Sequence, residues 1–100
     1  MTREKLIAWL EAATRQDRAI DGAVHDMMPK PKVVEPLRYT SSIDAALTLV
    51  PAGWHVSHAY WGASRAHFNL TKEMGVFAEG RAPTPALALC IAALKAGAQP

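Results

Sequence analysis

The chain has a single cysteine, Cys90, so no intrachain disulfide can form. Cys90 lies in the apolar run LALCIAAL, whereas a reactive thiolate needs an electropositive and partly exposed setting. An unpaired cysteine is also typical of proteins from a reducing compartment. We therefore expect a buried, unreactive thiol and a cytoplasmic location.

The chain also lacks a long hydrophobic run. The longest one, 86–94, is much shorter than the roughly 20 residues that a membrane-spanning helix needs. The N-terminal segment MTREKLIAWLEAATRQD carries charge on both sides of a short apolar stripe, unlike a secretory signal. We expect one domain over residues 1–100 and no membrane partner.

Charge of one sign is not concentrated anywhere in the sequence. Eleven Lys and Arg residues oppose nine Asp and Glu residues, for a net charge of +2. The basic residues are scattered, while a nucleic-acid-binding surface usually has a concentrated basic stripe. This distribution argues against a nucleic-acid partner, although a small nucleic-acid-binding protein stays among the alternatives.

No motif for catalysis, cofactors or metals is present. The six glycines are dispersed and build no phosphate-binding loop, and the serines fall at turn and cap positions that account for them. His55 and His58 are three apart on an expected strand, which places them on opposite faces, and the lone cysteine is remote from them. We expect no catalytic residue, no cofactor and no metal site.

Periodicity predicts two helices at the start of the chain. One stripe recurs at helical spacing and consists of Leu6, Trp9, Leu10 and Ala13. The segment 17–28 has the same period, and Thr2 and Asp17 are suitable N-caps for the two helices. A break near 14–16 lets them fold back as a pair. The proline-rich segment 29–36 predicts an extended connector, with an edge strand at Val33–Val34.

Two further helices have clear start signals. In YTSSIDAALTLVPAGW, Ser41 and Asp44 are spaced as a capping box, and Pro51 ends the helix. Near the C-terminus, Thr84 is an N-cap followed by a proline at the first helical position. The last helix has almost no polar face, so we expect it to be buried on most sides or to cover a wide sheet.

Between these helices, alternating residues predict a β-hairpin with strands at 54–61 and 65–71. A register that pairs Tyr60 with Ala66 and Val56 with Leu70 places His58 opposite Phe68 and collects the apolar side chains on one face. The segment 76–79 is a short third strand. The predicted fold is α+β: a small antiparallel sheet of two to three strands packed with about four helices, sandwich-like.

The stretches KLIAWLEAATRQDRAIDGAV, YTSSIDAALTLVPAGW and TPALALCIAALKA together resemble a family of small phage and prophage proteins described as a phage α/β/α sandwich domain. The resemblance covers most of the chain, except 28–38, where the family has more residues. It implies a sandwich fold and a phage setting. It implies no established activity or catalytic residue.

The polar face of the hairpin is the one feature that suggests a function. An exposed Trp beside an Arg is typical of protein contacts, and the candidate contact residues are His55, Trp61, Arg65, His67 and Asn69. We therefore expect a non-catalytic protein-binding module with a host or phage protein as its partner. A concrete form is an inhibitor of a host defence system, anti-CRISPR-like. An alternative is a virion or assembly accessory protein.

Overall fold

The computed structural model describes residues 2–27, 37–63, 65–73 and 75–98. Within them it confirms the α+β fold, with four helices and one three-stranded antiparallel sheet of order β1-β2-β3. In chain order the elements are α1 (Arg3–Ala12), α2 (Arg18–Met27), α3 (Ile43–Leu47), β1 (His55–Trp61), β2 (Ala66–Lys72), β3 (Val76–Ala82) and α4 (Pro85–Gly97).

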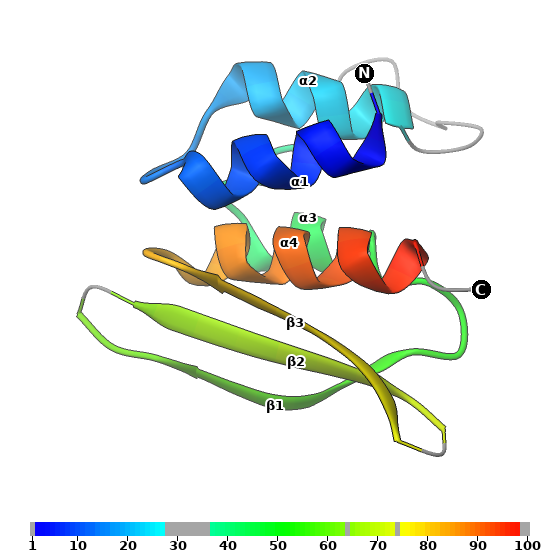
Figure 1. Ribbon diagram of the computed structural model, residues 1–100. Coiled ribbons are helices and arrows are strands. Elements are labelled where there is room, and N and C mark those ends of the chain that lie inside the picture. The colour runs from blue at the N-terminus through cyan, green and yellow to red at the C-terminus, as the bar shows by residue number, and fades with distance from the viewer. Residues whose placement is uncertain (1, 28–36, 64, 74, 99–100) are drawn as a thin grey trace.

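The elements form three layers with a helix in the middle (Figure 1). The sheet is one outer layer, α4 with α3 beside it is the central layer, and α1 with α2 is the other outer layer. The α/β/α order implied by the resemblance has the sheet between helices. Here α4 takes that position, and the described helices all lie on one face of the sheet.

Helix α4 begins where the sequence predicts. The Thr84 hydroxyl accepts a hydrogen bond from the Leu87 N–H at 3.4 Å, and Pro85 occupies the first turn, where its missing N–H costs nothing. Every residue from Ala86 to Leu94 is buried. The expectation of a helix buried on most sides is thus confirmed, because α4 has neighbours in both outer layers.

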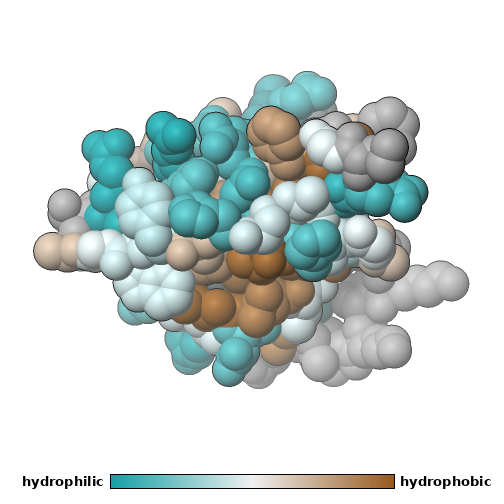
Figure 2. Space-filling model, turned by 90° about the horizontal axis from the view of Figure 1, so that it is seen from below, coloured by the Kyte–Doolittle hydropathy of each residue, from teal (hydrophilic) through white to brown (hydrophobic). Residues whose placement is uncertain are grey.

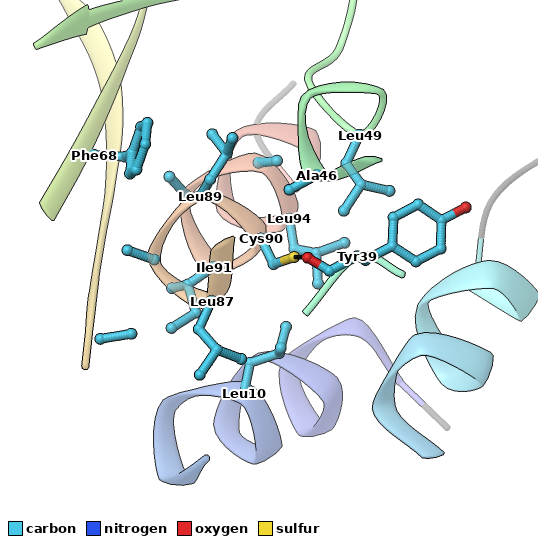
Figure 3. Packing of buried hydrophobic residues seen from close by; sticks show 14 of the residues in the cluster. Leu10, Tyr39, Ala46, Leu49, Phe68, Leu87, Leu89, Cys90, Ile91 and Leu94 are labelled. Carbon is cyan, nitrogen blue, oxygen red and sulfur yellow. Dashed lines mark hydrogen bonds between the residues drawn. The ribbon is translucent and has the colours of Figure 1, made fainter. Parts of the chain in front are cut away.

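The core surrounds this central helix (Figure 3). Phe68 from the sheet packs on one side of α4, and Leu10 from α1 packs on the other side. Both side chains are fully or almost fully buried. Burying a side chain of this size contributes roughly 1.5–3 kcal/mol, so the contacts on the two sides of α4 hold the three layers together.

Cys90 lies at the centre of this core, as the sequence predicts. Its thiol is fully buried and donates a weak hydrogen bond to the Tyr39 carbonyl oxygen at 3.1 Å. Burial, and next the charge of Asp21, raise the pKa of the Cys90 thiol to about 12. The same two causes, in the same order, raise the pKa of the Tyr39 hydroxyl above its usual value.

We expect Cys90 to be unreactive in the folded protein. With a pKa of about 12, roughly one thiol in ten thousand is ionised at pH 8, and the sulfur is enclosed. A thiol reagent such as DTNB should therefore label the folded protein only at the rate of unfolding, and should label it completely in denaturant. Labelling within seconds under native conditions would contradict the placement of this helix.

The first two helices have the predicted caps and lie side by side. The Thr2 hydroxyl accepts from the Lys5 N–H at 3.2 Å, and the Asp17 carboxylate accepts from the Ala19 N–H at 2.8 Å. Their buried residues include Leu6 and Leu10 in α1 and Ile20 in α2. Among the helices of the described segments, none is long and apolar enough to cross a bilayer.

The third helix is shorter than predicted and its cap is different. It spans Ile43–Leu47, and its N-cap is Ser42, whose hydroxyl accepts from the Ala45 N–H at 3.2 Å. The Ser41 hydroxyl instead hydrogen-bonds to the Arg38 carbonyl, because Ser41 belongs to the preceding turn. The predicted capping box is therefore wrong. The predicted strand at Val33–Val34 lies outside the described residues.

Candidate functional site

A β-bulge in β1 decides which side chains face which way. Val56 pairs with Leu70, as predicted, but two residues, Ser57 and His58, then lie opposite Asn69. From there on the register differs from the prediction by one residue. Tyr60 pairs with His67 rather than with Ala66, and His58 does not lie opposite Phe68. A bulge inserts one extra residue and reverses the faces beyond it.

The sheet therefore has two distinct faces. The inner face, toward α4, includes the buried residues Ala66, Phe68 and Leu70 of β2 and Ala78, Gly80 and Ala82 of β3. On the outer face no described element packs, as Figure 1 shows. By the register, the outer face consists of His55, Ser57, His58, Tyr60, His67, Asn69, Thr71, Phe77, Glu79 and Arg81.

The five predicted contact residues are distributed over three places. His55, His67 and Asn69 lie on the outer face, as expected. Arg65 lies in the hairpin connection, exposed, and lines a shallow hollow together with Arg81 and Glu11. Trp61 was assigned to the wrong face, because the bulge turns it inward. It stacks on Phe68 with ring centroids 5.9 Å apart and an angle of 15° between the planes.

Three rings cluster at the centre of the outer face. The centroids of His58, Tyr60 and His67 are 5.6–6.0 Å apart in all three pairs, and Tyr60 meets both imidazoles edge to face. Such arrangements are favourable for aromatic rings. His55 and His58, expected on opposite faces, are both on the outer face because the bulge lies between them.

Three side chains, those of His67, Glu79 and Arg81, interact in a row across the outer face from β2 to β3. His67 Nε2 lies 3.0 Å from a carboxylate oxygen of Glu79, and an Arg81 guanidinium nitrogen lies 3.9 Å from the same oxygen. The hydrogen bond from His67, and next the charge of Arg81, lower the pKa of Glu79 below its usual value. Glu79 therefore stays ionised in mild acid and holds both partners in place on the surface.

A polar cluster occupies the bulge itself. The Ser57 hydroxyl donates to the Asn69 carbonyl at 3.1 Å, and accepts from the Asn69 amide at 3.2 Å and from the Thr71 hydroxyl at 2.6 Å. These bonds link the extra residue of the bulge to two residues of β2. The cluster fixes the position of the bulge, and so the face on which His58 and Tyr60 lie.

Large apolar side chains are exposed mainly on the two edge strands. Of six such residues among those described, five lie on β1 or β3, namely Val56, Tyr60, Trp61, Val76 and Phe77. The sixth is Leu47 in α3. Seen from the sheet side in Figure 2, a hydrophobic patch lies near the middle of the molecule, with hydrophilic side chains along one side of it.

Five residues of the outer face were not predicted to lie there: His58, Tyr60, Phe77, Glu79 and Arg81. The first two were missed because a bulge leaves no mark in the alternation of β1. A signal for the other three exists. In 76–82 the small residues Ala78, Gly80 and Ala82 alternate with large ones, which is the pattern of a longer strand packed closely on a helix.

Two hollows of the described surface lie beside the starts of α4 and α2. The one beside the start of α4, about 410 Å³, has Arg15 as its one ionisable lining residue. A smaller one, about 140 Å³, includes Asp17 and Asp21, but their carboxylates already accept hydrogen bonds from the chain. Among the described residues, no three His, Cys, Asp or Glu side chains are placed to hold a metal ion.

No protein-family model matches the chain, and neither the curated proteins nor the solved structures include a match.

Proposed function

We propose that the protein is a non-catalytic protein-binding module that recognises its partner through the outer face of the sheet. The observation that carries the proposal is the composition of that face. Tyr60 and Phe77 are 53% and 58% exposed, and Arg81 on β3 pairs with His67, which on its other side pairs with Tyr60. Tyr and Arg are the residue types that most often dominate binding energy in protein interfaces.

The arrangement of the charges supports a protein partner over a nucleic acid. Glu79 lies on the outer face and pairs with both His67 and Arg81. A carboxylate in this position would repel a phosphate backbone, and the net charge of +2 is small for a nucleic-acid-binding domain. A protein surface with mixed charges and an apolar centre is the more complementary partner.

The setting that we propose is a phage or prophage, on the strength of the sequence resemblance alone. In its concrete form, the module binds a host defence complex and inhibits it. The alternative role, a virion or assembly accessory protein, is favoured by one observation: β1 is an edge strand that carries no charge, a feature suited to assembly.

Capture of a partner from host lysate tests the proposal. The substitution Arg81→Glu should lower the yield of a specific partner at least about tenfold, because a charge is reversed inside the contact. Arg15→Glu is the matched control, since Arg15 is exposed, lies outside the sheet in the connection between α1 and α2, and changes the net charge equally. Expression in the host should also weaken its immunity to phage.

Two outcomes would contradict the proposal. If both variants retain the partner, the outer face is not the contact surface. If the purified protein instead shifts DNA or RNA in a gel, with an affinity that falls steeply as salt is raised, the nucleic-acid alternative replaces it.

A further inference from the structure

The two edges of the sheet differ in how well they are protected. Natural edge strands usually carry Lys, other charges or Pro, which prevent pairing with another strand. β3 carries Glu79 and Arg81 and lies against α4. β1, with the sequence HVSHAYW, has no Asp, Glu, Lys, Arg or Pro. Apart from the bulge at 56–58, the free edge of β1 therefore lacks the usual obstacles to strand pairing.

β1 also extends beyond the helix that covers the rest of the sheet. Helix α4 packs on β3 and β2, and β2 is the one described element with extensive contacts to β1. As a result, inner-face side chains of β1 stay exposed. Val56 is 37% exposed, and Trp61 is 54% exposed although one side of its ring stacks on Phe68. An apolar ledge made of Val56, Ala59 and Trp61 thus runs along the free edge.

The hydrogen-bond pattern shows which residues of β1 can accept a further strand. The Gly62 N–H donates to the Arg65 carbonyl at 2.9 Å, next to the pair of Trp61 with Ala66. Bonded and non-bonded pairs alternate in an antiparallel ladder. Trp61 and Ala59 are therefore in non-bonded pairs with β2, and their N–H and C=O groups point to the free edge. The bulge lies before this part, at 56–58, so 59–61 is regular.

We propose that this edge pairs with the same edge of a second copy of the chain. In an antiparallel pair with its two-fold axis at Tyr60, Ala59 of each copy exchanges hydrogen bonds with Trp61 of the other. The smallest side chain of the ledge then lies opposite the largest, on the inner face that α4 leaves uncovered. The strand has no Asp, Glu, Lys or Arg, so no fixed charges of the two copies repel each other.

The resulting dimer has one continuous six-stranded sheet with both outer faces on the same side. This inference goes beyond the proposed function and uses a different surface, the edge and the inner ledge of β1. It provides two copies of the contact surface side by side, which raises the avidity for a repeated partner. Because the contact is short, we expect a modest dissociation constant, on the order of 1–100 µM.

A cysteine-trapping experiment tests the pairing directly. The substitution Tyr60→Cys places the two sulfurs opposite each other at a non-bonded position, where Cα atoms are about 4.5 Å apart, suitable for a disulfide. With oxidised glutathione as the oxidant, Tyr60→Cys should form a covalent dimer at least about tenfold faster than Phe77→Cys. Phe77 is the matched control, since it is equally exposed on the opposite edge strand. The native Cys90 is buried and does not interfere.

Sedimentation of the unmodified protein completes the test. The mass should approach twice 10.8 kDa as the concentration rises above the dissociation constant, and Ala59→Lys should keep it at 10.8 kDa. The proposal is overturned if the protein stays monomeric. It is also overturned if the Phe77→Cys variant crosslinks at least as fast as the Tyr60→Cys variant. Neither readout uses the lysate partner or Arg81, so a monomer that still captures its partner contradicts the dimer and leaves the proposed function standing.

Discussion

Replacing Gly80 by alanine is expected to destabilise the protein by about 3 kcal/mol or more, a large share of the about 5–15 kcal/mol by which a domain of this kind is typically stable. A Cβ atom at this position would overlap the Ala88 carbonyl oxygen of α4 and would lie 2.6 Å from the Ala92 backbone nitrogen. Both atoms belong to the backbone of a buried helix and cannot move aside. The strand would have to separate from α4, and the contacts of β3 with the core would be lost.

Gly22→Ala is the matched control for Gly80→Ala, and its effect should have the opposite sign. Gly22 lies inside α2, and a Cβ atom there meets no described atom within 4 Å. The same chemical change should therefore stabilise the protein by roughly 0.5–1 kcal/mol through helix propensity. Urea unfolding monitored by tryptophan fluorescence measures both free energies. Equal effects of the two substitutions would refute the close contact between β3 and α4.

Removing the Asp21 carboxylate should have the second large effect, about 3–4 kcal/mol for Asp21→Ala. Asp21 is 1% exposed and accepts hydrogen bonds from both the backbone N–H and the hydroxyl of Thr40, each at 2.8 Å. Thr40 is itself 1% exposed, so the substitution leaves its buried N–H without an acceptor and its hydroxyl with the weaker bond to the Asp17 carbonyl at 3.2 Å. The Thr40 hydroxyl also accepts a hydrogen bond from the Asp17 N–H at 2.8 Å. Because Asp17 caps α2, a displaced Thr40 would weaken the start of this helix as well.

Asp21→Asn separates the hydrogen bonds from the charge. An asparagine oxygen can still accept both bonds from Thr40, whereas the attraction to Arg18, whose guanidinium lies 3.0 Å from the carboxylate, is lost. We expect a loss of about 1 kcal/mol, since the Arg18 side chain is half exposed. Thermal unfolding of the two variants checks this order. An Asp21→Asn variant as unstable as Asp21→Ala would show that the charge, and not the link to Thr40, is what matters.

Much of the fold follows from local signals in the sequence. The caps at Thr2, Asp17 and Thr84 are correct, because a cap depends on residues within one turn of it. The antiparallel hairpin is correct because alternation extends over two strands. The cap of α3 was misplaced by one residue. Neighbouring serines satisfy the same rule, and the choice between Ser41 and Ser42 depends on the turn before the helix.

The candidate surface was harder to predict, because its faces depend on contacts distant in the sequence. The bulge at 57–58 exists through bonds from Ser57 to Asn69 and Thr71, twelve and fourteen residues away. A one-residue shift moves every later side chain to the other face. For this reason Trp61 was assigned outward and Tyr60 inward, whereas His67 and Asn69, on the strand without a bulge, were placed correctly.

The proposed contact surface requires a sheet that is covered by α4 on one face and open on the other. Solvent paramagnetic relaxation in NMR, measured with a soluble gadolinium chelate, tests this most directly along β3. We predict strong enhancement for the side-chain protons of Glu79 and Arg81, and almost none for the methyl groups of Ala78 and Ala82. Equal protection of all four residues would show that another element covers the outer face, and would contradict its role as the contact surface.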